Sequence, residues 1–62
     1  MDEHKAIGSA FETELTNLYM VLTNSFLMAK GDAEKEKDAE QAFALGLELN
    51  RKVYKRALEL IK

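Results

Sequence analysis

The residues of this chain that could do chemistry are few, and their spacing does not suit it. His4 is the single histidine, and its neighbours Asp2 and Glu3 would point to other sides of a helix. The sequence lacks the Glu-x-x-His spacing of di-iron helical bundles. Glu36 and Glu40 are one helical turn apart, but they stand in a solvated segment of mixed charge. We therefore expect no metal site and no acid–base pair.

Nucleophilic and cofactor chemistry also lack their usual signals. The chain contains no cysteine, which excludes disulfides and thiolate ligands. It contains no P-loop, no glycine-rich dinucleotide fingerprint and no nucleophile motif. The sequence thus predicts a protein that is not an enzyme, with no catalytic residues and no cofactor.

Length and composition limit the architecture to one small domain. A chain of 62 residues buries only about 60% of its unfolded surface when it folds alone. With 47% hydrophobic and 32% charged residues, it resembles neither a disordered nor a membrane-embedded chain. These values favour a small helical protein that needs a partner chain to complete its core.

Three residues in the middle of the chain divide it into two helices. Gly31 is typical of a left-handed helix C-cap, Lys30 suits the negative end of a helix dipole, and Asp32 can cap the next segment. A second start signal is the capping-box spacing of Asp38 and Gln41. We expect one helix over residues 3–30, a turn over 31–38 and a second helix over 39–62. The pattern leaves open whether residues 33–38 form a loop or the solvated first turns of that helix.

Both predicted helices carry an apolar stripe with steps of three and four residues. In the first helix the stripe comprises Ile7, Phe11, Leu15, Leu18, Tyr19, Leu22, Ser25, Phe26 and Ala29. In the second it comprises Ala39, Ala42, Phe43, Gly46, Leu47, Leu49, Val53, Tyr54, Ala57, Leu60 and Ile61. The opposite side of the second helix is polar and mostly charged, which makes this helix clearly amphipathic.

The predicted fold is an all-α antiparallel two-helix hairpin. Two rods cannot enclose a core, so a lone hairpin would leave half of each stripe in water. Burying one Leu, Ile or Phe side chain stabilises a fold by about 1.5–3 kcal/mol. We therefore expect the hairpin to dimerise, or to assemble further, into a core like that of a four-helix bundle.

A second apolar surface lies on the first helix, outside its stripe. Met20 and Leu27 are seven residues apart on the side away from the stripe, and Val21 and Met28, also seven apart, widen its flank. Such a surface, rich in methionine, is a candidate docking face for a partner. Two alternatives stay open: the face is buried in the protein's own oligomer, or its exposure is accidental.

The second helix contains two candidates for close packing and register. Gly46 costs a helix interior about 1 kcal/mol relative to alanine, and a close helix approach would explain its presence. Asn50 comes one turn later in the apolar seam, as do the buried asparagines that fix register in coiled coils. Alternatively, Asn50 reaches water at the edge of the stripe.

The outer side of the second helix carries a cluster of bases, which we name the basic face. Its members are Arg51, Lys52, Lys55 and Arg56. They suggest contact with a nucleic-acid backbone, although no exposed aromatic accompanies them for base stacking. An ordinary solvated helix face is the simpler interpretation.

The predicted function is that of a non-enzymatic homo-oligomer that acts through protein–protein contacts, as a small adaptor, scaffold or regulatory subunit. Its expected partners are further copies of itself and, in one alternative, a second protein. The runner-up is a small nucleic-acid-binding regulator that uses the basic face. The acidic start of the chain does not look like a signal peptide, and residues 15–29 are too short and too polar for a membrane span, so we expect a cytoplasmic protein.

Overall fold

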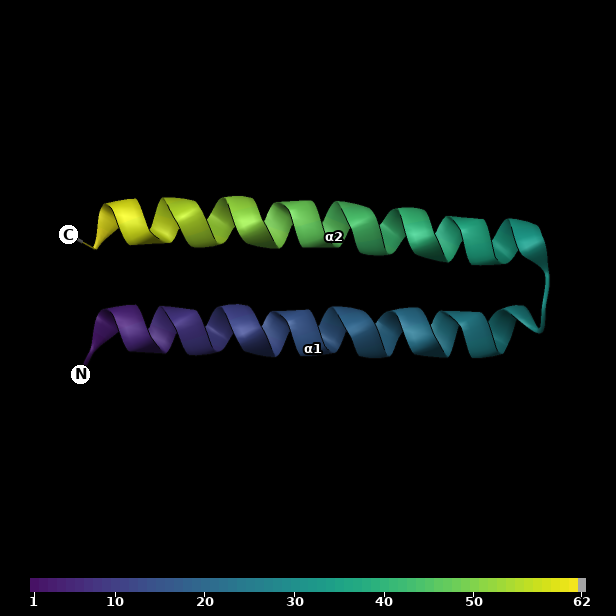
Figure 1. Ribbon diagram of the computed structural model, residues 1–62, viewed down its shortest axis with the longest axis horizontal. Coiled ribbons are helices and arrows are strands. Elements are labelled where there is room, and N and C mark those ends of the chain that lie inside the picture. The colour runs from purple at the N-terminus through teal and green to yellow at the C-terminus, as the bar shows by residue number, and fades with distance from the viewer. Residues whose placement is uncertain (62) are drawn as a thin grey trace.

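The chain forms an antiparallel hairpin of two long helices (Figure 1). A computed structural model describes residues 1–61, with helix α1 over Glu3–Ala29 and helix α2 over Ala33–Leu60. The helices pack against each other along their whole length, and the N-terminus lies beside the end of α2. The predicted all-helical hairpin is therefore confirmed.

Each helix begins at an aspartate that caps it. The Asp2 carboxylate accepts a hydrogen bond from the Lys5 backbone N–H at 3.2 Å. The Asp32 carboxylate accepts two, from the backbone N–H groups of Glu34 at 3.0 Å and Lys35 at 3.2 Å. Since an N-cap supplies acceptors for otherwise unpaired N–H groups, both helices start immediately after their caps.

The second helix begins six residues earlier than the sequence predicted. The expected turn over 31–38 and helix over 39–62 are wrong at this boundary, because residues 33–38 are helical. Asp32 rather than Asp38 caps the helix, and acidic residues in its first turn favour the positive end of the helix dipole. Of the two interpretations that were open for 33–38, the solvated helical turns are correct. The predicted end at residue 62 lies outside the described residues.

A very short turn connects the helices. α1 ends at Ala29, one residue before the predicted end, because Lys30 adopts the left-handed conformation with φ 51°. Gly31 is also left-handed, with φ 83°. The Asp32 backbone N–H then donates to the Ala29 carbonyl at 3.0 Å. Two successive left-handed residues reverse the chain and force the helices to lie antiparallel.

The hairpin is flat and has almost no interior. Its Cα atoms span 46 × 17 × 7 Å, with a radius of gyration of 14.5 Å, whereas a compact domain of this length has about 11 Å. Among residues 1–61 only Ala29 is fully buried, at 5% exposure. The residues between the helices, such as Phe11, Leu18 and Phe43, are only half-buried.

The exposed area of the chain also shows that the hairpin buries little of its surface. The chain exposes 5210 Å², about 1,200 Å² more than the roughly 4,000 Å² typical of a compact monomer of 7.0 kDa. Ten large apolar side chains are each more than half exposed. The hairpin alone therefore leaves a large apolar surface in water.

Candidate interaction surfaces

The two helices lie close together at Gly46. A Cβ atom placed on this residue would lie 2.6 Å from the Leu18 Cδ2 atom and 3.7 Å from its Cδ1 atom. The missing side chain of Gly46 thus leaves the space that the Leu18 side chain fills. The sequence predicted a close approach at Gly46, and the neighbour in the hairpin is a side chain of α1 rather than another backbone.

A polar and an aromatic contact join the helices nearer their free ends. The Asn50 side-chain amide donates to the Phe11 backbone carbonyl at 3.3 Å, in a half-buried position. The Phe11 ring lies 4.5 Å from the Tyr54 ring, centroid to centroid, with 31° between the planes. Asn50 is therefore hydrogen-bonded to α1 within the hairpin.

One side of the hairpin is an apolar groove that both helices line. A hollow of about 310 Å³ lies between Ile7 and Ala10 of α1 and Val53 of α2, and a more enclosed one of about 60 Å³ lies between Val21 and Ala42. A third hollow, of about 460 Å³, lies between Met28 and Lys35 at the turn.

Helical spacing extends this groove across one face of the molecule. Glu14, Val21 and Met28 repeat every seven residues along α1, and so do Ala42 with Leu49 and Val53 with Leu60 along α2. We call this surface the groove face, which we define by Ala10, Glu14, Val21, Met28, Ala42, Leu49, Val53 and Leu60, with Leu45 and Asn17 at its outer edges.

The groove face carries most of the exposed apolar side chains. Val21, Met28, Leu45, Leu49, Val53 and Leu60 are between 57% and 76% exposed. On the opposite face, a hollow is lined by Phe11, Leu15 and Tyr54 together with the charged residues Lys5 and Glu12. Of the ten large apolar side chains that are more than half exposed, six lie on the groove face.

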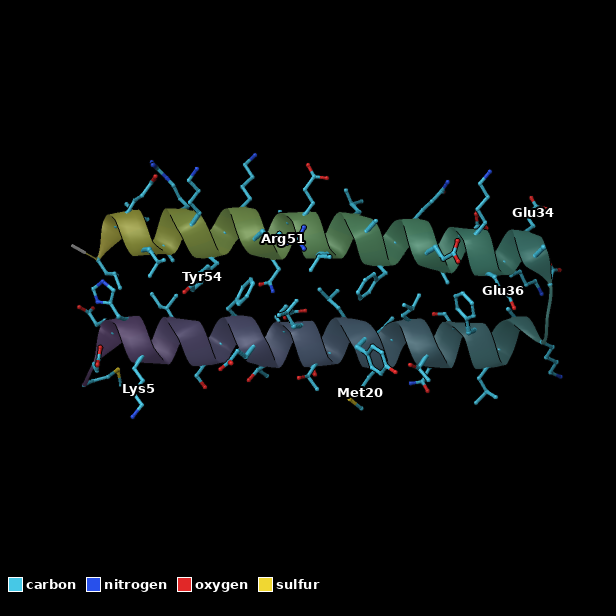
Figure 2. The ribbon with its side chains drawn as sticks, viewed as in Figure 1. Lys5, Met20, Glu34, Glu36, Arg51 and Tyr54 are labelled. Atoms are coloured by element: carbon cyan, nitrogen blue, oxygen red, sulfur yellow. The ribbon has the colours of Figure 1, made fainter. Side chains whose placement is uncertain are left out.

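The four residues predicted to form a single docking face belong to two surfaces. Val21 and Met28 lie on the groove face. Met20 points away from α2 (Figure 2), and Leu27, seven residues later, shares its side. We call this second surface the back of α1, which comprises Thr16, Met20, Thr23 and Leu27.

The back of α1 is less polar than its composition indicates. The Thr16 hydroxyl donates to the Glu12 carbonyl at 3.1 Å, and the Thr23 hydroxyl donates to the Tyr19 carbonyl at 3.0 Å. Because these hydroxyls are bonded to the helix itself, the threonines present mainly their methyl groups outward. Met20 and Leu27, 55% and 74% exposed, complete an uncharged surface.

All four bases of the basic face are exposed. The Arg56 guanidinium pairs with the Glu59 carboxylate at 3.0 Å, the one ion pair within residues 1–61. A shallow hollow of about 400 Å³ lies between this face and the apolar residues Leu49 and Val53. The basic face thus borders the groove face along the outer edge of α2.

Residues suited to chemistry remain apart. His4 is exposed, and no three His, Cys, Asp or Glu side chains gather as metal ligands in the part of the chain that the structure describes. In residues 1–61, neither helix has an apolar stretch long enough to cross a membrane. The surfaces described above are built mainly of exposed apolar side chains.

The sequence predicted that half of each stripe would lie in water but not which residues. Leu49, Val53 and Leu60 were placed on the stripe of the second helix, and Leu45 was assigned to no surface. In the hairpin all four are more than half exposed. Their spacing contained a partial signal, because Leu45 and Leu49 lie at one edge of the α2 stripe, whereas Gly46 and Ala57 lie at its middle.

Comparison with known proteins adds no relative. No protein family, no curated protein and no solved structure matches this chain.

Proposed function

We propose that this protein is a non-enzymatic homo-oligomer that acts through protein–protein contacts, as a small adaptor, scaffold or regulatory subunit. The observation that carries the proposal is the groove face, an apolar surface built by both helices on a hairpin with one buried residue among 1–61. Contiguous exposed apolar surface of this kind is typical of a contact site. Self-association would cover it and give the core of a four-helix bundle.

The back of α1 supports a role beyond self-association. It lies on a different side of α1 from the groove face, and Met20 points away from α2 (Figure 2). If the groove face is occupied by further copies, the back of α1 stays on the outside of the bundle. Met20 and Leu27 would then be the contact site for a second protein.

Two matched double variants test whether the groove face serves self-association and the back of α1 does not. Val21→Lys with Met28→Glu places one positive and one negative charge on the groove face. Met20→Lys with Leu27→Glu places the same charges, at the same spacing, on the back of the same helix. Both variants leave the net charge at −2, so they differ only in the face they alter.

We expect the groove variant to dissociate and the back variant to remain assembled, as measured by sedimentation and by the dependence of the melting temperature on concentration. Charges forced into a dry interface cost several kcal/mol, a large part of the stability of a small domain. A well-folded wild-type monomer with a concentration-independent melt would overturn the proposal. Dissociation by the back variant instead would mean that the oligomer uses the back of α1.

The second candidate is a nucleic-acid-binding regulator, and the exposed basic face is the observation that favours it. A dimer would carry two such faces, and backbone contacts by Lys and Arg would make binding strongly dependent on salt. Against it stand the Arg56–Glu59 pair, which occupies one base, and the overall charge of −2.

A further inference from the structure

We infer that the occupant of the groove face is a second copy of this chain, packed face to face and antiparallel, so that the two turns lie at opposite ends of the dimer. This inference rests on the proposed homo-oligomer and adds to it the face, the symmetry and the register. The two-fold axis crosses both helices near their middles, at about residue 16 of α1 and residue 47 of α2, which gives full overlap of the helices.

The area left uncovered fits one further copy. Each hairpin exposes about 1,200 Å² more than a compact monomer of its mass. Two hairpins that covered this excess would bury about 2,400 Å² in total, which lies in the range of obligate homodimers. The hairpin is also only 7 Å thick between its Cα atoms, so a second layer is what a core requires.

Contacts within the hairpin show which residues lie at similar heights. Phe11 contacts both Asn50 and Tyr54, and Leu18 lies against Gly46. Helical spacing then places Ala10 about level with Val53, and Val21 about level with Ala42. Stepping one turn from each pair toward the middle places Glu14 level with Leu49 and Asn17 level with Leu45. The contact of Leu18 with Gly46 lies at this same central height.

The antiparallel arrangement matches these central residues by chemistry. It stacks α1 on the partner's α1 and α2 on the partner's α2, with heights reversed about the axis. Glu14 then faces the partner's Asn17, whose amide can donate to the carboxylate. Leu45 faces the partner's Leu49. Polar residues thus meet polar ones and leucines meet leucines.

The same arrangement pairs small residues with large ones away from the axis. Ala42 is placed between the partner's Leu49 and the partner's Val53, and Ala10 is placed against the partner's Val21. Alternation of small and large side chains across an interface lets the two layers interlock.

The alternative two-fold arrangement, with both turns at one end, mismatches the centre. It stacks α1 on the partner's α2 at equal height, so Glu14 meets the partner's Leu49 and Asn17 meets the partner's Leu45. Each copy would then place a carboxylate and an amide against leucine, with no hydrogen-bond partner from the other copy. The positions of Glu14 and Asn17 therefore favour the antiparallel dimer.

Cysteine cross-linking tests the face and the direction together, because the natural chain has no cysteine. Ala42→Cys and Val53→Cys are made in separate chains, one with a mass tag, mixed and oxidised. The antiparallel dimer brings the two positions together and should give at least tenfold more tagged–untagged disulfide than a mixture of Val21→Cys and Ala42→Cys chains. The second mixture is the matched control, because the other arrangement brings that pair together instead.

The outcomes separate this inference from the proposed function. A dimer that links through Ala42→Cys and Val53→Cys supports both. A dimer that links through Val21→Cys and Ala42→Cys, or through neither pair, overturns the antiparallel register but leaves the homo-oligomer standing. A folded monomer, verified by sedimentation of the unmodified chain at micromolar concentration, overturns both.

Discussion

The two helices are nearly equal in length, yet they present opposite chemistry to the outside. Between Ala6 and Ala29, α1 carries only two charged residues, Glu12 and Glu14, and its back is made of methionine, leucine and threonine. The outer side of α2 carries the basic face and is exposed along its length. α2 is a helix with one apolar and one solvated side, whereas α1 is uncharged on almost every side.

This contrast indicates where further contacts are to be sought. A solvated, charged outer side needs no explanation beyond solubility, whereas an uncharged outer side on a surface helix does. Both helices contribute to the groove face, which we assign to self-association. The back of α1 would then remain as uncharged surface for another protein, and substitutions on each helix can test whether this is so.

The largest effect is expected at the contact on which the pairing of the helices depends. Gly46→Leu places a side chain where the Leu18 methyl groups lie, within 2.6 Å of the new Cβ atom. Overpacking costs about 1–3 kcal/mol, and a small domain has only about 5 kcal/mol to lose. We expect loss of assembly and of most of the cooperative melt, as followed by circular dichroism and sedimentation.

Gly46→Ala is the control for that variant. It adds one methyl group, improves helix propensity by about 1 kcal/mol, and meets the mobile end of the Leu18 side chain rather than backbone. We expect it to remain assembled. If both substitutions raised the melting temperature, Gly46 would face solvent. The apolar and the solvated side of α2 would then be wrongly assigned.

A smaller effect is expected at the polar contact between the helices. Asn50→Leu removes the hydrogen bond to the Phe11 carbonyl and adds an apolar contact in a half-buried site. We expect a melting temperature higher by about 4–8 °C, as about 1 kcal/mol gives in a domain of this size. The same variant should link through more than one pair of cysteine positions, since register is less strictly set. An unchanged melt with an unchanged linkage pattern would show that Asn50 has no part in register.

The smallest effect is expected on the basic face. Lys55→Glu with Arg56→Glu should change stability by no more than about 0.5 kcal/mol and leave the oligomer intact, because exposed charges contribute little. Fluorescence anisotropy with a short RNA and a short DNA duplex at low salt checks the second function. Binding by the wild type that this variant loses would make α2, rather than α1, the functional outer side.

The helices, the turn and the hairpin were predictable because their signals are local. Asp2 and Asp32 cap their helices with their own side chains, and Gly31 marks the reversal. The error at residues 33–38 arose from two competing signals. Asp38 with Gln41 resembles a capping box, but Asp32 comes first and already supplies two hydrogen bonds, so the helix starts there.

The division of the apolar surface was not predictable in the same way. Periodicity shows that Met20 and Val21 differ by about 100° around α1, but it does not show which of them lies beside α2. That choice depends on how the α1 stripe meets the half-buried residues of α2, among them Gly46, Asn50 and Tyr54. Tyr19 illustrates the limit, since it was placed in the stripe and is 66% exposed.

The tight turn at Lys30 and Gly31 also sets the reach of the molecule. It folds the chain back so completely that the N-terminus and the end of α2 lie side by side, at the far end of a hairpin 46 Å long (Figure 1). In the antiparallel dimer the two pairs of termini therefore sit at opposite ends of one stiff rod. Anything fused to either end would be held about this distance from its counterpart, so the dimer would act as a spacer of fixed span. Energy transfer between dyes placed at Met1 would report that span directly.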